Sequence, residues 1–341
     1  AVAVREPNTV PQGATAMTTG RLGQQAAPPN AAYAGQVVHF PDPVRAKRHP
    51  AGVRVDGDGY PDFTPYARAA VEIADPPEGF GVDELRLTDY VSANAALDAA
   101  GHELWETLPA VATPHGWTWH HVARTRRLQL VPVEVKALLR HHAGLATTAV
   151  DHGKRGTRPL QETRPAHFAL PKGATAVSEQ QVLAAEEDLG YRLPGAYRDF
   201  LKAAGGCAPA GVALDAELGL LVDQPFLTLR DQAAANDLVY ANKCLRDHLT
   251  KDYLGVAFVQ GGLLAVKVRG ERTGSVWFCA YDDARDQDGW SVQDRVERLL
   301  LPCGDDFDAF LDRLAGSPPE LETVANLMVD GGFAEAVPVE G

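Results

Sequence analysis

The distribution of charge along the chain divides it into two chemically different halves. Residues 1–170 carry 17 Lys and Arg against 17 Asp and Glu, whereas residues 171–341 carry 15 against 28. The net charge of −13 therefore lies entirely in the second half, while the first half holds ten of the 11 histidines. A chain of 341 residues is long enough for two cores. This asymmetry predicts two different domains, argues against one repeated unit, and excludes a uniformly basic nucleic-acid binder.

Changes in composition suggest where the two domains begin and end. Residues 1–35 are rich in Ala, Pro, Gln and Gly and have few large apolar side chains, which predicts a disordered tether. We expect a first domain over 36–148 and a polar, basic linker over 149–173. A second domain is expected over 174–320, followed by a C-terminal tail over 321–341.

Neither a membrane segment nor an export signal is visible. No stretch reaches the roughly 18–20 apolar residues that a membrane span needs, and residues 1–20 lack a basic region followed by an apolar core. The cysteines are spaced by tens of residues, which is typical of buried reduced thiols. We therefore expect a cytoplasmic protein with no membrane partner.

Local patterns predict the elements of the first half. Residues 117–121 and 128–131 read as two strands joined by an Arg-rich turn, and residues 132–142 as a helix. Asp89 is a plausible N-cap for a further helix over 89–99. A hairpin followed by a helix is therefore predicted.

The second half predicts helices on both sides of an antiparallel sheet. Ser178 and Gln181 form a capping-box pattern that opens a helix ended by Gly190. The last strong helix is expected to begin at the N-cap Asp305. A second helix over 194–204 and strands over 256–259, 263–268 and 275–281 complete an α+β domain.

The histidine pair of the first hairpin carries the densest chemistry. Adjacent residues on a strand point to opposite faces, so His120 and His121 cannot share one role. The helix after the hairpin is expected to bring His141 close to His120. One histidine could bind a divalent ion while its neighbour deprotonates a water, which is the chemistry of phosphodiester hydrolysis.

These residues resemble a nuclease family. Trp119-His120-His121, Leu130-Val131-Pro132 and His141 before Gly144 resemble the WHH branch of the HNH/endonuclease VII superfamily, whose modules occur in bacterial polymorphic toxins. Upstream segments of the same branch are matched by Gly59-Tyr60-Pro61-Asp62-Phe63 with Tyr66, and by Asp89 with Ala93-Asn94.

The resemblance implies an HNH-like ββα-metal module with named roles. His121 would be the general base, and His120 would act in catalysis as a metal ligand. His141 would be a second ligand, with His142 as a further candidate. The implied cofactor is Mg²⁺, Mn²⁺, Ni²⁺ or Zn²⁺, and the implied substrate is DNA or RNA.

One position departs from the family pattern. The family usually has a further histidine where this chain has Lys136, and an ammonium group cannot replace a neutral imidazole at a metal. Either His142 or a carboxylate such as Glu134 or Asp62 compensates, or the module is a degraded nuclease.

The second half resembles the SUKH superfamily over about residues 174–316. The resemblance rests on the pattern around Glu186, Leu189-Gly190, Leu193-Pro194, Tyr197 and Phe200-Leu201, with Gly274-Ser275-Val276-Trp277-Phe278 and Phe307-Asp308-Ala309-Phe310-Leu311 later in the chain. SUKH proteins are mostly immunity proteins that neutralise nuclease toxins. Acidic clusters suited to such an interface are Asp282, Asp283, Asp286 and Asp288, and Asp305, Asp306 and Asp308.

Together the two resemblances predict a toxin/immunity-type fusion. In the first hypothesis, a metal-dependent nuclease domain is restrained by the SUKH domain or simply joined to it. In the alternative, the histidine module is catalytically dead and the SUKH domain neutralises a nuclease toxin. The partner of the acidic domain is accordingly either such a toxin or the N-terminal domain of the same chain.

Overall fold

The structure of the chain is a computed structural model. It describes residues 2–3, 27–75, 82–144, 147, 165–229, 234–316 and 319–339. Within these ranges, no helix combines the length and the apolar character that crossing a membrane requires.

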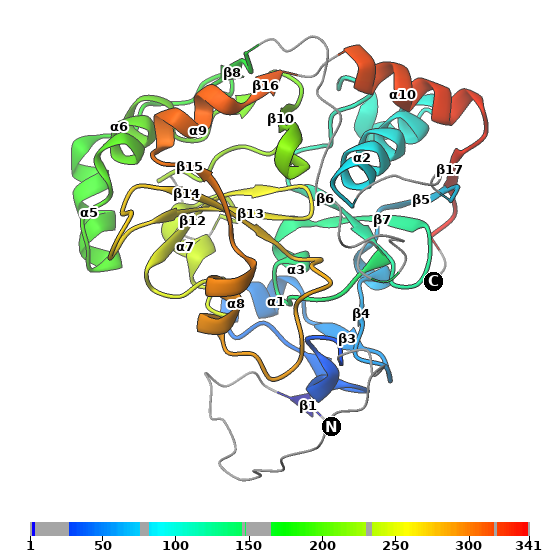
Figure 1. Cartoon of the computed structure of the whole chain (residues 1–341), viewed down its shortest axis with the longest axis horizontal. Helices are drawn as coiled ribbons and strands as arrows, with labels where there is room; N and C mark the ends of the chain where they lie inside the picture. The colour runs from blue at the N-terminus through cyan, green and yellow to red at the C-terminus, as the bar shows by residue number, and fades with distance from the viewer. Residues whose placement is uncertain are drawn as a thin grey trace.

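The first half is built on a four-stranded antiparallel sheet in the order β17-β5-β7-β6 (Figure 1). Helix α2 (Val82–Ala99) packs on this sheet, and α10 (Pro319–Asp330) packs on α2. The short helix α3 (Val133–Lys136) follows β7 directly. The strands are β5 (Ala69–Ile73), β6 (Trp117–His121), β7 (Arg127–Pro132) and β17 (Ala334–Val337).

A smaller sheet lies beside it at the N-terminal end of the chain (Figure 1). Helix α1 (Pro43–Arg48) belongs to this region, and the Asp42 carboxylate caps it by accepting a hydrogen bond from the Arg45 backbone N–H. The strands are β1 (Val2–Ala3), β2 (Val37–Val38), β3 (Val53–Val55) and β4 (Pro61–Asp62).

The second half contains an antiparallel meander in the order β12-β13-β14-β15. Its strands are β12 (Tyr253–Val259), β13 (Gly262–Lys267), β14 (Val276–Ala280) and β15 (Leu301–Gly304). Two small sheets accompany it, formed by β8 (Phe168–Ala169) with β9 (Ala208–Pro209), and by β10 (Ala213–Asp215) with β11 (Leu220–Val222) and β16 (Ala315–Gly316). The helices are α5 (Glu179–Leu189), α6 (Gly195–Ala204), α7 (Leu238–Asn242), α8 (Val292–Leu299) and α9 (Phe307–Arg313).

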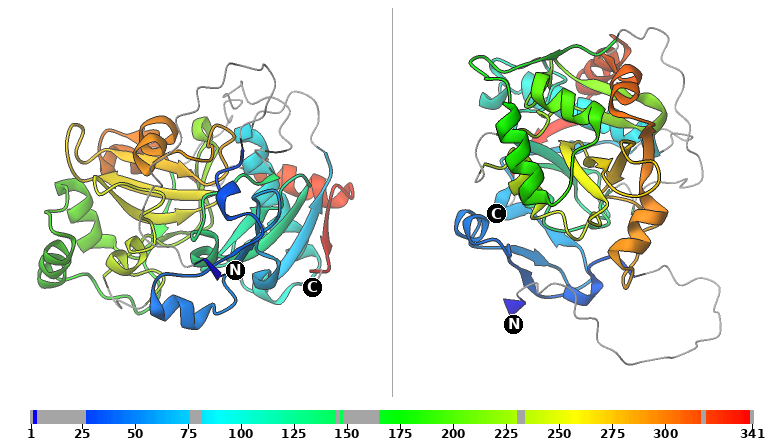
Figure 2. Two further views of the ribbon diagram at one scale, coloured as in Figure 1. Left: turned by 90° about the horizontal axis from the view of Figure 1, so that it is seen from below. Right: turned by 90° about the vertical axis from the view of Figure 1, so that its left-hand side faces the viewer.

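The two halves pack directly against each other. Leu87 and Val91 of α2 belong to one buried cluster with Leu214 and Leu221 of the second half. The views in Figure 2 agree with Figure 1 in placing α2 and α10 on one side of the molecule and α5 and α6 on the other. Because apolar side chains from both halves share buried clusters, separating the halves would expose apolar surface to water.

Several elements match the sequence expectations. The α+β class is confirmed, and the predicted hairpin is formed by β6 and β7. Ser178 and Gln181 make the capping box, and Gly190 ends α5 in the left-handed conformation with φ of 77°. Short-range signals of this kind depend little on the rest of the chain.

Three predicted element boundaries are corrected. The helix expected over 132–142 is only the four-residue α3, because the backbone beyond it bonds to the second half instead. Asp89 lies inside α2 and is not an N-cap. The N-cap of α9 is Asp306 and not Asp305, since the Asp306 carboxylate accepts from the Ala309 N–H.

The expected tether and tail also contain ordered structure. Residues 27–35 of the tether are described, and buried Asn30 donates a hydrogen bond to the Arg140 carbonyl. The segment expected as a tail contains most of α10 and all of β17, which pairs with β5 and so covers an edge of the first sheet. Residues 149–164 of the expected linker lie outside the described ranges.

The first prediction tests whether α10 is part of the first half. Ala325 is fully buried in α10, whereas Leu327 on the same helix is 64% exposed. We expect Ala325→Asp to lower the free energy of unfolding by about 3 kcal/mol or more, because it buries an unpaired charge. The matched control Leu327→Asp changes it by about 0.5 kcal/mol or less. Equal urea unfolding curves for both variants would contradict the packing of α10 on α2.

Candidate functional site

The three residues Trp119, His120 and His121 lie at the end of β6, and each contacts a residue from an upstream segment. Asn94 Oδ1 accepts a hydrogen bond of 2.8 Å from Trp119 Nε1. Phe63 packs edge-on against His120, with ring centroids 4.7 Å apart. Asp89 pairs with His121, as described next. The upstream segments singled out in the sequence therefore converge on one strand.

His121 is held by a buried carboxylate. Its Nε2 lies 2.9 Å from Asp89 Oδ2, and both side chains are 2% exposed. Arg126 donates to both oxygens of the same carboxylate, at 2.7 and 2.9 Å. A carboxylate that accepts from an imidazole N–H fixes the orientation of the ring, which is the arrangement found around catalytic and metal-binding histidines.

His120 points to the opposite face of β6 and meets His141, as the sequence predicted. The two ring centroids are 5.1 Å apart, and Phe63 packs against both rings. His120 is 2% exposed and His141 is fully buried. Within the described ranges, neither His120 Nδ1 nor His141 Nε2 has a hydrogen-bond partner. Two such ring nitrogens thus lie in one buried cluster.

Lys136 adds a buried amine beside this cluster. Its side chain is 3% exposed, and Nζ donates to the Trp119 carbonyl. Burial lowers the pKa of Lys136 to about 7, while the nearby Asp282 carboxylate opposes this shift. Burial also lowers the pKa of His141 to about 3 and that of His120 well below its usual value, and the charge of Lys136 adds to both shifts.

The donors do not complete a metal site. No group of three or more His, Cys, Asp or Glu side chains in the described part of the chain is arranged to hold a metal ion. A protein site for a divalent transition metal normally offers at least three ligands. The Lys136 ammonium further opposes a second cation among the rings. The predicted metal ligands His120 and His141 are together, but the set remains incomplete.

The residues proposed to compensate for Lys136 are engaged elsewhere. Both oxygens of Glu134 accept from Arg48, at 2.7 and 2.9 Å, and Oε1 also lies 2.6 Å from His49 Nε2. Asp62 is exposed and accepts from the Thr64 N–H. His142 donates to the Asp286 carbonyl at 2.7 Å.

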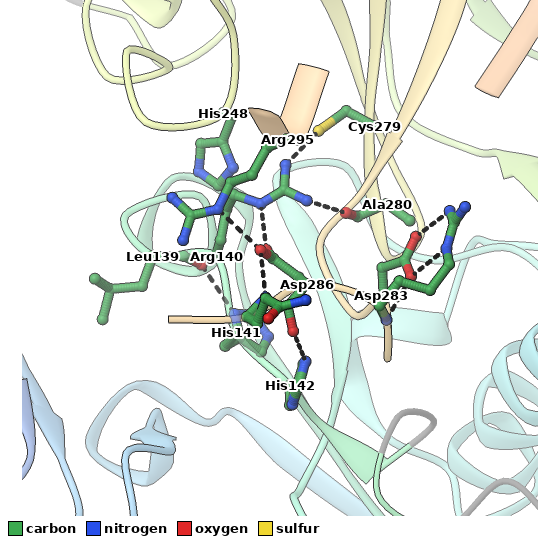
Figure 3. A network of polar contacts seen from close by, with 12 residues as sticks. Leu139, Arg140, His141, His142, His248, Cys279, Ala280, Asp283, Asp286 and Arg295 are labelled. Atoms are coloured by element: carbon green, nitrogen blue, oxygen red, sulfur yellow. Dashed lines mark hydrogen bonds and ion pairs between the residues drawn. The ribbon is translucent and has the colours of Figure 1, made fainter. Parts of the chain in front are cut away.

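A loop of the second half covers this region of the first half (Figure 3). Arg140 Nε donates to Asp286 Oδ2 at 2.8 Å, and the two side chains are 2% and 0% exposed. Arg140 also donates to Cys279 Sγ at 3.1 Å. The Ala143 N–H donates to Asp282 Oδ1 at 2.8 Å. The acidic cluster after β14 is therefore an interface to the first half of the same chain.

Among the other predicted acidic positions, two pair within the second half, and one uses its backbone. Asp283 pairs with Arg285, and Asp305 pairs with Arg272 on the surface. The Asp288 N–H donates to the Ala27 carbonyl.

A second contact between the halves involves the turn between β12 and β13. Gln260 Oε1 accepts from the Trp119 N–H at 3.0 Å and from Thr118 Oγ1 at 3.1 Å, and Gln260 Nε2 donates to Asp223 at 2.8 Å. Burial raises the pKa of Asp223 to about 6. Next to it, Gln224 Oε1 accepts from the Gly116 N–H at 2.7 Å. The side chains of two buried glutamines thereby accept hydrogen bonds from backbone N–H groups in β6 and in the residue directly before it.

Sequence reasoning missed the residues that join the halves. Arg140, Gln224 and Gln260 carry no local motif, and their partners lie more than 100 positions away in the chain. The role of Asp89 could have been inferred, because it belongs to a segment that the family resemblance had already singled out.

The second prediction concerns acid sensitivity. His120 and His141 stay neutral in the folded chain well below the ordinary pKa of 6.5 and gain protons on unfolding, so stability falls as the pH drops below about 6.5. We expect His141→Asn to reduce this slope by about 1.4 kcal/mol per pH unit. Urea unfolding between pH 7 and pH 4.5 measures it, with surface His167→Asn as control. An unchanged slope would show that His141 is not buried neutral.

The third prediction tests the effect of Lys136 on metal binding. We expect the full wild-type chain to bind Zn²⁺ weakly and Lys136→His to bind it at least about tenfold more tightly, because a third imidazole would join His120 and His141. Isothermal titration calorimetry measures the affinity, with surface Lys202→His as the matched control. Tight Zn²⁺ binding by the wild type that is lost in His141→Ala would contradict the incomplete ligand set.

Comparison with known families finds one matching segment in each half of the chain. Residues 109–151 match a nuclease family of the HNH/ENDO VII superfamily with conserved WHH, and residues 176–313 match the SMI1/KNR4 family (SUKH-1). The comparison with curated proteins finds no match. Both resemblances seen in the sequence are confirmed. The chain therefore carries one segment that matches the WHH nuclease family and one that matches SUKH-1, a combination that supports a nuclease toxin/immunity-type fusion.

Proposed function

We propose that the chain is a binding protein of the toxin/immunity type. In this proposal the SUKH-1 half keeps the WHH half closed, and it neutralises a nuclease toxin. The observation that carries the proposal is the burial of His120, His121 and His141 beside an interface formed by the loop that contains Asp282 and Asp286. A phosphodiester cannot contact side chains that are at most 2% exposed. This burial supports a folded chain that is not a constitutive nuclease.

The basic turn between β6 and β7 supports the same proposal. A nuclease needs free cations to hold the phosphates of its substrate. Each arginine of this turn forms an ion pair with a carboxylate: Arg124 with Asp58, Arg126 with Asp89, and Arg127 with Glu72.

The four unpaired cysteines support a reducing compartment such as the cytoplasm as the place of action. Cys207, Cys279 and Cys303 are buried, and burial raises the pKa of each thiol.

A second candidate function is metal-dependent hydrolysis of DNA or RNA by a WHH half that the SUKH-1 half restrains. The buried pair of Asp89 and His121 favours it, since a carboxylate-oriented imidazole is suited to act as a general base. In this candidate the acidic loop acts as an intramolecular inhibitor.

The fourth prediction tests the binding-protein proposal with the full chain. We expect no cleavage of plasmid DNA or tRNA with Mg²⁺, Mn²⁺, Ni²⁺ or Zn²⁺ that depends on His121, measured by gel electrophoresis against His121→Ala. Cleavage by the wild type that His121→Ala abolishes would overturn the proposal.

An interface variant tests restraint directly. Asp286→Ala leaves Arg140 buried without its partner, which costs about 3–5 kcal/mol and weakens the interface. Asp305→Ala removes the same charge from the surface and serves as its control. The binding-protein proposal expects both variants to stay inactive, whereas His121-dependent cleavage by Asp286→Ala alone would establish the restrained nuclease.

A further inference from the structure

The proposed function leaves open which surface of the SUKH-1 half meets a partner protein. Asp282 and Asp286 are buried against the WHH half, and so are Gln224 and Gln260. These side chains are not accessible to a second protein. A partner in solution must therefore use another face.

Three hollows in the described part of the chain surround α5. This helix lies on the side of the molecule away from α2 and α10, as Figures 1 and 2 show. The largest of the three has a volume of about 670 Å³ and lies between the end of α5, the segment after α7 and the start of β12. We call it the α5 groove.

The floor and the rim of the α5 groove differ in chemistry. The floor includes the buried side chains of Leu249 and Leu254. The rim carries three exposed cations, Arg246, Lys251 and Arg269, although this half of the chain has 15 basic against 28 acidic residues. No carboxylate in the described ranges forms an ion pair with these three cations. They are available to an anionic partner.

The mixture of groups favours a peptide over a nucleic acid. Asp188 and Asp247 also line the α5 groove, so its lining is not continuously basic, which disfavours a phosphate backbone. An apolar floor beneath cations suits a segment that combines carboxylates with a large apolar side chain, because both burial and charge pairing contribute. Arg269 is additionally positioned by stacking on Tyr191, with its guanidinium carbon 5.0 Å from the ring centre.

We infer that the α5 groove binds an acidic segment of a partner protein, anchored by a leucine or phenylalanine. The inference rests on the proposed function, because it takes the partner to be the nuclease that the chain neutralises. It implies that the partner is held through an acidic peptide on its surface and not through its basic substrate groove.

The experiment measures binding of defined probes to the full chain by fluorescence anisotropy. The probes are a labelled peptide that alternates Glu with Leu and Phe, its counterpart with Lys for Glu, and a single-stranded oligothymidylate. We expect the acidic peptide to bind and the other two probes not to bind. Equal binding of the Lys peptide, or displacement of the acidic peptide by the oligonucleotide, would overturn the inference.

Two variants form a matched pair. Arg269 and Arg272 are both exposed, and each guanidinium carbon lies 5.0 Å from an aromatic ring centre, but only Arg269 lines the α5 groove. We expect Arg269→Glu to weaken binding of the acidic peptide about tenfold and Arg272→Glu to leave it unchanged. Arg246→Glu repeats the test at a second rim position. Equal effects of groove and control variants would refute the inference.

Failure of the inference and failure of the proposed function give different readouts. If the acidic peptide does not bind to the α5 groove, only the inference about the groove is contradicted. His121-dependent cleavage of nucleic acid by the wild-type chain concerns the proposed function and does not depend on the groove.

Discussion

The buried ion pair between Arg140 and Asp286 is the interaction on which the arrangement of the two halves depends. Both charges are removed from water, so each needs its partner to offset the loss of hydration. Both carboxylate oxygens of Asp286 are used, because Arg295 donates to the second one at 2.9 Å. A displacement of the loop that broke this pair would leave two buried charges, Arg140 and Asp286, without each other. The contact between the halves is therefore close to all-or-none.

The features that could be predicted from the sequence are those that short-range patterns determine. The capping box at Ser178 depends on residues three positions apart, and the opposite orientations of His120 and His121 follow from strand geometry alone. The approach of His141 to His120 follows from a hairpin and the segment next to it, and the structure bears it out. These features needed no knowledge of the second half.

The rest depended on contacts between distant parts of the chain. The helix expected through residue 142 stops at Lys136, and beyond it the Ala143 N–H donates to a carboxylate of the second half. Asp89 has the residue type of an N-cap, but it serves as a partner of Arg126 and His121 inside α2. The clustering of His120 and His141 was thus predictable, while the cover that the second half places over them had no local signal.

The position of β17 has a consequence for synthesis of the chain. This strand pairs with β5, so the sheet that carries His120 and His121 cannot be completed until residue 337 has been translated. By then the whole segment that matches SUKH-1, which ends at residue 313, has already been translated. Domains usually fold in order from the N-terminus as they leave the ribosome. In this chain, the sheet of the first half is therefore completed only after the whole segment that matches SUKH-1 has been translated.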